Sequence, residues 1–231
     1  MSYIDGYFDR SSDIIRVVER QNKERVFKEY PIKYTFYHED PSGKFKSTTG
    51  KPLSRIVCKN TKDFHKELAI NRNKTLFESD INPMFQCLSE NYLNKDAPDL
   101  NIAFFDIEAD FDPEKGFSQP NDPFMPITAI TVSLQWLDTM VTFAMPPKTM
   151  GIEEAKEITK GIDNLYLYKD EADMLKAFLD IIEDADVISG WNSEGYDLPY
   201  IINRIKKVMS KDDTRRLCLW KQMPKKRTFE R

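Results

Sequence analysis

A polar stretch, Asn94-Lys95-Asp96-Ala97-Pro98-Asp99, separates two regions of this 231-residue chain that carry different patterns. Before it, short segments rich in β-branched and aromatic residues alternate with polar breaks, which predicts an antiparallel meander of strands. After it, strand-like segments alternate with segments of helical periodicity, which predicts a mixed α/β domain. We therefore expect an α/β (α+β) fold with two domains, residues 1–98 and 99–231.

The first region is predicted to hold four strands, a loop and two helices. The strands are expected at Tyr3–Phe8, Ile14–Arg20, Arg25–Tyr30 and Ile32–Tyr37. The Gly/Ser/Thr-rich stretch at residues 41–50 is expected to be a loop. Helical spacing of apolar residues predicts one helix over 61–71 and a shorter one within 82–93.

The second region is predicted to hold five strands and two helices. The strands are expected at Leu100–Ala109, Ile127–Gln135, Met140–Met145, Leu165–Tyr168 and Asp186–Trp191, the last of them buried. Asp170 is expected to cap a helix that ends near Asp184. A second helix is expected over 197–209, with Pro199 tolerated in its first turn.

Composition excludes several classes of protein. No run of about eighteen apolar residues is present, which argues against a membrane-spanning helix, and the N-terminus lacks the pattern of a secretory signal. Three widely spaced cysteines fit neither a disulfide framework nor a zinc site and suit a reducing cytoplasm. The formal net charge is −4, which is unlike a protein that only binds nucleic acid.

The C-terminal end is basic although the whole chain is acidic. Such an end can contact phosphates, or it can be a solvated helix face with a frayed tail. The basic residues are Arg204, Lys206, Lys207, Lys211, Arg215, Arg216, Lys221, Lys225, Lys226, Arg227 and Arg231.

Two carboxylates stand close together near the end of the first strand of the second region. Asp106 and Glu108 are two residues apart, so they project to the same side of a strand, roughly 6.6 Å apart along it. Two like charges there are costly to bury unless a cation neutralises them, and Mg²⁺ or Mn²⁺ prefers carboxylate oxygens. The alternative is that both acids face water at the end of the strand.

A second segment, Gly190-Trp191-Asn192 to Asp197-Leu198-Pro199-Tyr200, predicts a strand, a turn and a helix. Asp197 falls near the helix N-terminus, where it can be a functional acid or an ordinary cap. Asn192 and Tyr196 could contact a nucleotide, or could serve the turn and the packing. The acids that follow the first pair, among them Asp110, are expected to be solvated.

Together the two segments carry a resemblance. Phe105-Asp106-Ile107-Glu108 resembles the first exonuclease motif of family B DNA polymerases, and the segment from Gly190 to Arg204 resembles the second, in the same order and spacing. The likeness is greatest to the replicative polymerases of large tailed phages, where a segment similar to Gly50-Lys51-Pro52 also precedes a helix. It is strong over residues 100–204 and weaker before them.

The resemblance implies an N-terminal domain followed by an RNase H-like 3′→5′ exonuclease domain that proofreads DNA by two-metal hydrolysis. In the family's pattern Asp106 would bridge two Mg²⁺ or Mn²⁺ ions, Glu108 would bind one of them and Asp197 the other. Asn192 and Tyr196 would contact the 3′-terminal nucleotide. The implied partners are the 3′ end of single-stranded DNA and primer–template DNA, in the cytoplasm of a bacterial host if the chain is phage-encoded.

The sequence also departs from the family. No Tyr-x-x-x-Asp motif follows Asp197, so the exonuclease domain is expected to be incomplete and the isolated chain inactive. The remaining polymerase polypeptide is then an expected partner, whether the chain is a shortened fragment or one half of a split polymerase.

Two alternatives stay open. One is a non-catalytic nucleic-acid-binding subunit of a split polymerase, since the family's N-terminal domain resembles an RNA-binding fold and RNA is then a candidate ligand. The other is an unrelated RNase H-like metal nuclease that completes its site with an acid such as Asp110.

Overall fold

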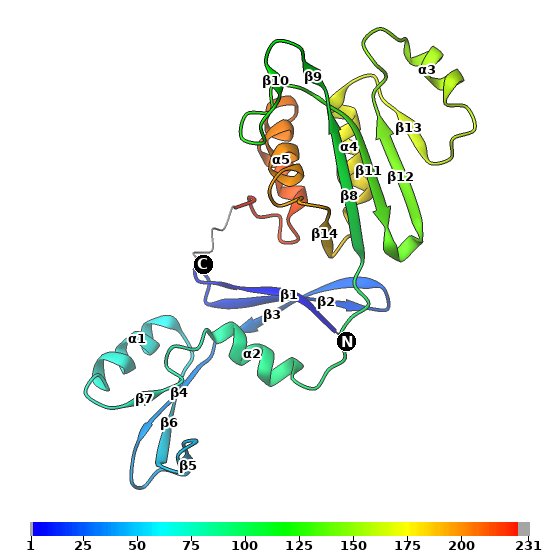
Figure 1. Cartoon of the computed structure of the whole chain (residues 1–231). Coiled ribbons are helices and arrows are strands. Elements are labelled where there is room, and N and C mark those ends of the chain that lie inside the picture. Colours follow the sequence, from blue (N-terminus) through cyan, green and yellow to red (C-terminus); the bar gives the residue numbers. More distant parts are fainter. Residues whose placement is uncertain (1, 226–231) are drawn as a thin grey trace. The chain divides into compact units, whose positions relative to one another are not determined.

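The computed structural model describes residues 2–225, and the chain divides into two compact units between Asp99 and Leu100 (Figure 1). Each unit has its own sheets and helices, and the mixed α/β class expected from the sequence is confirmed. None of the helices in the described part of the chain is long and apolar enough to cross a membrane.

The first unit begins with an antiparallel three-stranded meander, as expected. Its strands are β1 (Ser2–Asp9), β2 (Ile14–Gln21) and β3 (Glu24–Pro31), in the order β1-β2-β3. Asn22 and Lys23 join β2 to β3 with φ of 51° and 70°. Two consecutive residues at positive φ are typical of the tight turn that matches the twist of a hairpin.

The fourth strand does not continue this meander, contrary to expectation. The chain is not extended in a sheet at Ile32 and Lys33, and β4 (Tyr34–Glu39) then enters a second sheet of order β5-β6-β4-β7. Its other members are β5 (Phe45–Lys46), β6 (Pro52–Cys58) and β7 (Leu76–Phe77), none of which the sequence pattern predicted.

The two expected helices of this unit are present. α1 (Thr61–Ile70) begins at the cap Asn60, whose side chain accepts a hydrogen bond from the Asp63 N–H. α2 (Pro83–Tyr92) has Pro83 in its first turn. Gln86 on α2 bonds both backbone groups of Thr35, at 2.7 and 2.9 Å, and so joins the helix to β4.

The second unit is built on a mixed sheet of order β13-β12-β11-β8-β14. The strands are β8 (Ile102–Ala109), β11 (Ile127–Leu134), β12 (Thr139–Ala144), β13 (Leu165–Leu167) and β14 (Val187–Ser189). β11 is antiparallel to β8 and β12, whereas β14 runs parallel to β8 and β13 runs parallel to β12. All five strands were expected, with slightly different ends.

Two helices, α4 (Glu171–Ile181) and α5 (Asp197–Val208), pack on one face of this sheet (Figure 1). Asp170 caps α4 as expected, because its side chain accepts from the Asp173 N–H at 3.0 Å. A cluster of buried hydrophobic residues lies between the helices and the sheet and includes Ala103, Phe105, Ile107, Ile130, Val132, Phe178, Tyr200 and Ile201.

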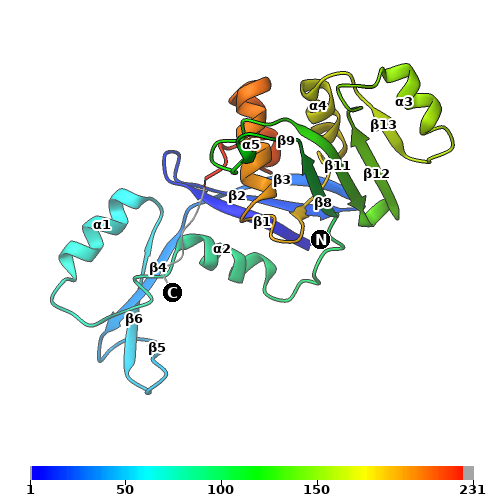
Figure 2. The same cartoon turned by 45° about the horizontal axis from the view of Figure 1, so that its top comes forward.

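Several elements of this unit differ from expectation. β14 is an edge strand with Val187 exposed, so it is not buried. A short helix, α3 (Ile152–Ile158), was not predicted and lies beside β13 (Figures 1 and 2). The expected acidic loop after β8 folds into a small hairpin of β9 (Phe111–Asp112) and β10 (Gly116–Phe117). Two 3-10 helices, Gln135–Leu137 and Asp212–Leu217, complete the unit.

Candidate active site

The two sides of β8 differ sharply in burial. Ala103, Phe105 and Ile107 are buried under α4 and α5, whereas Asp106 and Glu108 lie on the opposite, exposed face. The alternation of apolar and acidic residues is therefore the period-two pattern of a strand with one covered face. The two acids are side by side as predicted, but they are not buried on this face.

The segment between β14 and α5 approaches β8 very closely. A Cβ on Gly190 would lie 2.3 Å from the carbonyl oxygen of Phe105, so only glycine fits there. Asn192 then takes a left-handed conformation, with φ of 51°, and its carbonyl accepts from the Gly195 and Tyr196 N–H groups. This tight turn brings the first residue of α5, Asp197, back toward β8.

Asp197 is buried, with 6% of its surface exposed. It is the first residue of α5 and does not cap the helix, since Tyr196 occupies the cap position without a side-chain hydrogen bond. Burial is the main cause that raises the pKa of Asp197, and the negative charges of Asp106 and Glu108 raise it further. Hydrogen bonds from its own N–H and from the Ile107 N–H oppose that rise.

The charges of Asp106 and Glu108 both act on the pKa of Asp197. β14 pairs with β8 only as far as Phe104, so the edge of β8 beyond that point is available to the Asp197 carboxylate. The charges that raise the pKa of this buried acid come from two further acids, and perturbed acids of this kind cluster at functional sites.

The donor set suits a hard divalent cation, because all three side chains supply carboxylate oxygens. The arrangement of the three carboxylates fits a divalent cation only in part. Within residues 2–225, no group of three or more His, Cys, Asp or Glu side chains is arranged so that it could hold a metal ion. The carboxylates lie within reach of each other's charge but do not converge on one point.

The two predicted substrate contacts have structural partners. The Asn192 side chain lies against Gly195, where an added Cβ would be 2.6 Å from Asn192 Oδ1. The Tyr196 hydroxyl donates to the Ser118 carbonyl at 3.3 Å, and burial, followed by the charge of Asp197, raises the pKa of Tyr196. Asp110 forms an ion pair with Lys148 at 3.4 Å.

Sequence reasoning missed the exposed aromatic residues that follow Glu108 and Gly190 in the chain. Phe111 and Phe117 on the β9–β10 hairpin are 48% and 69% exposed, with ring centroids 4.9 Å apart. Trp191 follows Gly190 and is 92% exposed. Large apolar side chains among mostly polar residues were the available signal.

The basic C-terminal region is less free than its composition indicates. Arg204 is buried and paired with Glu171, Arg215 pairs with Asp212, and Arg216 pairs with Asp180. Three basic residues of that region, Lys226, Arg227 and Arg231, lie outside the described residues.

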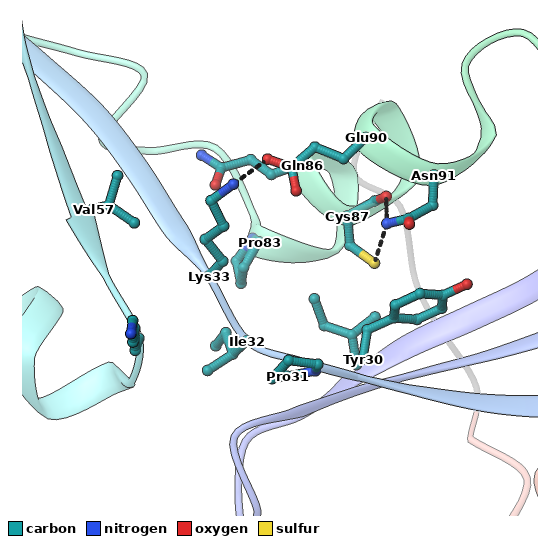
Figure 3. A pocket seen from close by; sticks show the side chains of 12 residues that line it. Tyr30, Pro31, Ile32, Lys33, Val57, Pro83, Gln86, Cys87, Glu90 and Asn91 are labelled. Atoms are coloured by element: carbon teal, nitrogen blue, oxygen red, sulfur yellow. Dashed lines mark hydrogen bonds and ion pairs between the residues drawn. The ribbon is translucent and has the colours of Figure 1, made fainter.

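A separate hollow lies in the first unit, between α2 and the start of β4 (Figure 3). It has a volume of about 540 Å³ and an apolar floor that includes Ile15, Ile32 and Cys87. Lys33 and Glu90 form an ion pair of 2.6 Å at its rim. Its lining contains no pair of acids comparable to that on β8.

Comparison with known proteins gives this geometry a family context. The chain is 26% identical over 227 residues to the DNA-directed DNA polymerase of Escherichia phage RB69, and 24% identical over 226 residues to that of Enterobacteria phage T4. Each match covers 87% of this chain and 25% of the phage protein. The DNA polymerase catalytic subunit of Saimiriine herpesvirus 2 is 31% identical over 116 residues, which is 48% of this chain and 11% of that subunit.

The chain spans about a quarter of the length of the two phage polymerases. Residues 54–229 match the exonuclease domain of DNA polymerase family B, and this segment contains all three acids. The chain therefore belongs to DNA polymerase family B and covers the region of its exonuclease domain.

Proposed function

We propose that this chain is the N-terminal and partial proofreading 3′→5′ exonuclease portion of a replicative DNA polymerase. The observation that supports this most is the burial of Asp197 at the edge of β8, where its pKa is raised by burial and by Asp106 and Glu108. A folding core alone gives no reason to place three acids together, whereas hydrolysis of a phosphodiester with divalent ions does.

In this proposal Asp106, Glu108 and Asp197 hold the divalent ions. Bound Mg²⁺ or Mn²⁺ supplies activation of water and neutralisation of charge on the phosphate. The role of the chain itself is to keep the carboxylates in place: β8 fixes two of them on one face, and the turn at Gly190 fixes the third. The expected further acid and tyrosine would come from the remaining polymerase polypeptide.

The substrate in this proposal is the 3′ end of single-stranded DNA. Exposed aromatic side chains provide stacking surfaces for unpaired bases, and Phe111 and Phe117 lie on the hairpin that follows the acidic strand directly. Asn192 and Tyr196 would contact the terminal nucleotide. Primer–template DNA would be held by the rest of the polymerase.

The test compares the 231-residue chain alone with the chain supplemented by a downstream polypeptide of a related phage polymerase. A 3′-labelled oligonucleotide is incubated with each, with Mg²⁺ and with Mn²⁺. We expect little degradation by the chain alone and degradation by the supplemented protein. Asp106→Ala should lower the latter rate by about a thousandfold, because acids that act as one unit cannot replace each other.

Efficient degradation by the chain alone that depends on Asp106 would show that the site is already complete. Failure of every supplemented protein, with both ions supplied, would show that the three acids are wrongly assigned. Lys207→Ala, an exposed change on the far part of α5, is the matched control.

A second candidate function, nucleic-acid binding without catalysis, is supported by the first unit. On the face of its second sheet opposite α1, Arg55 lies over the Phe45 ring at 5.1 Å, and Tyr37 contacts the same ring. Val57 and Lys59 extend this exposed surface toward the hollow beside α2. Basic and aromatic side chains together suit single-stranded nucleic acid, including RNA.

This second function predicts binding that weakens with salt and survives Asp106→Ala. The double change Arg55→Ala and Lys59→Ala should weaken binding of a fluorescent RNA or DNA oligonucleotide, measured by anisotropy. Lys62→Ala on α1 is the control, since that helix covers the other face. Equal binding by both variants would exclude this surface.

A further inference from the structure

The cap residue of α5 and one side of the helix carry a line of polar groups, of which only Tyr196 has a proposed contact with DNA. Tyr196, Tyr200, Asn203 and Arg204 are spaced by four, seven and eight residues from the first, so they share one face of a helix. Each donates a side-chain hydrogen bond to a backbone carbonyl of the segment at residues 118–126, which we call the clasped segment. We call these four residues the α5 clasp.

The carbonyls bound by the clasp belong to a segment that cannot form regular pairing for itself. Pro120, Pro123 and Pro126 supply no N–H group, and the segment's own pairing is limited to one bridge between Gln119 and Asp122, so its other carbonyls need other donors. The distances are 2.9 Å from the Tyr200 hydroxyl to Met125, 2.8 Å from Asn203 Nδ2 to Pro120, and 2.9 Å from Arg204 Nη1 to Pro123. Tyr196 reaches Ser118 at 3.3 Å.

A buried ion pair holds the clasp to the sheet. Arg204 and Glu171 are 6% and 7% exposed, and the guanidinium donates to both carboxylate oxygens, with Nε–Oε1 at 2.7 Å. Glu171 Oε1 also accepts from the Ile127 N–H at 2.9 Å. α4, α5 and the first residue of β11 are therefore tied together at the point where the clasped segment ends.

The clasped segment carries the hairpin with the exposed aromatic residues. At one end of the hairpin, the Asp110 N–H donates to the Pro126 carbonyl at 2.9 Å. At the other end, Phe117 continues directly into Ser118, which is 2% exposed. Both ends of the hairpin thus depend on the segment that α5 holds, and α5 is also the helix that begins with Asp197.

We propose that Tyr200 and Asn203 are positioning residues that fix the β9–β10 hairpin relative to Asp197, so that a DNA strand stacked on the hairpin presents its 3′ end to the acids. This rests on the exonuclease proposal, and it assigns the clasp to substrate positioning. Neither residue touches the reacting atoms.

The test uses the double variant Tyr200→Phe and Asn203→Ala, which removes two donors but keeps the buried ring and the Arg204–Glu171 pair. Tyr166→Phe combined with Lys207→Ala is the control, because both positions are exposed and lie off the clasp. Hydrogen exchange in the 231-residue chain should become roughly fivefold or more faster over residues 110–126, and unchanged in α4 and β12.

The second readout is kinetic, in the chain supplemented with a downstream polypeptide that gives exonuclease activity. KM for a single-stranded oligonucleotide should rise about threefold or more, while kcat stays within about twofold, because substrate placement is lost before the chemistry is. The control variant should keep both values.

Each result decides a separate point. Unchanged exchange over 110–126 would overturn the clasp, and faster exchange with unchanged KM would overturn its role in positioning. A fall in kcat alone would place the two residues in the chemistry instead. If no supplemented protein shows exonuclease activity, the exonuclease proposal and the positioning role fail together, and the exchange experiment still decides whether the clasp holds the hairpin.

Discussion

Two buried carboxylates, Glu19 in the first unit and Asp197 in the second, have opposite shifts of pKa. Glu19 on β2 is 0% exposed, yet its pKa is lowered: burial raises it, but hydrogen bonds from Lys28, Tyr92 and Gln21 outweigh that effect. Asp197 is nearly as buried, but the neighbouring side chains that act on its pKa are two acids, and its pKa is raised.

The opposite shifts of pKa indicate that Glu19 stabilises the fold in its charged form, whereas the charge of Asp197 destabilises it. The charge of Glu19 is compensated by Lys28, with Nζ–Oε2 at 2.8 Å, and by the Tyr92 hydroxyl of α2. That network ties α2 to the first sheet. Asp197 has no cationic partner of this kind among the groups that act on its pKa, which is what a site awaiting a cation requires.

The largest effect on stability is expected at Glu19. Glu19→Ala should lower the free energy of unfolding of the first unit by about 1–3 kcal/mol, because the Tyr92 hydroxyl and the half-buried Lys28 lose their common acceptor. Since the folded pKa is lowered, this stabilisation is present above the unfolded value of 4.5 and is lost as the pH falls through the folded pKa. Urea unfolding at several pH values measures it.

Glu29→Ala is the control for this prediction, because Glu29 forms an exposed ion pair with Arg16 on the same sheet. Glu29→Ala should lower the free energy of unfolding by less than about 1 kcal/mol. Equal free energies of unfolding for the two variants would show that Glu19 does not stabilise the first unit, and the contrast with Asp197 would then fail.

A substitution at Asp197 is expected to raise stability, by less than the loss at Glu19. Asp197→Asn should raise the Tm of the second unit at pH 7 by a few degrees, because the neutral amide avoids burial of a charge beside two acids. The raised pKa means that the penalty is absent below the unfolded value of 3.8 and grows as the pH rises to the folded pKa. The gain in Tm should therefore disappear in acid.

Asp173→Asn serves as the matched control, since Asp173 is an exposed acid in the first turn of α4. A loss of Tm in Asp197→Asn at pH 7 would show that Asp197 is a structural acid like Glu19. The same variant should abolish exonuclease activity in the supplemented protein.

The smallest effect is expected from divalent ions. Mn²⁺ should raise the Tm of the second unit slightly, since an ion at a concentration equal to its Kd adds only about 0.4 kcal/mol. The rise should be absent in the double variant Asp106→Ala and Glu108→Ala, and the Tm of the first unit should not change. Calorimetry with Mn²⁺ and with Ca²⁺ checks this, and an equal rise in the double variant would mean that the ion binds elsewhere.

Local patterns in the sequence determined much of the second unit. The alternation along β8 placed Asp106 and Glu108 on one side and Phe105 and Ile107 on the other, and the structure shows the same division. Asp170 was expected to cap α4 and does so. These features depend on neighbours two to four residues away, which is the range that periodicity and capping rules report.

Register and sheet membership could not be read in this way. Strict alternation along β11 places Ile130, Val132 and Leu134 in the core, but a shift of register between Ile127 and Ala129 puts Ile127 in the core as well. β4 was expected to extend the first meander and instead pairs with β6. Both outcomes depend on strands distant in sequence, whose pairing leaves no local signal.

By itself, then, the sequence determined which acids exist, on which elements they lie and, through its resemblance, which family to expect. Only the tertiary structure decided that Asp197 lies at the free edge of β8, that Arg204 is buried against Glu171, and that α5 holds the segment that carries the hairpin. The physical reason is that charged and hydrogen-bonding partners far apart in the chain meet only when the helices pack onto the sheet. A local sequence pattern indicates whether a residue is buried, but it does not indicate which residue it will pair with.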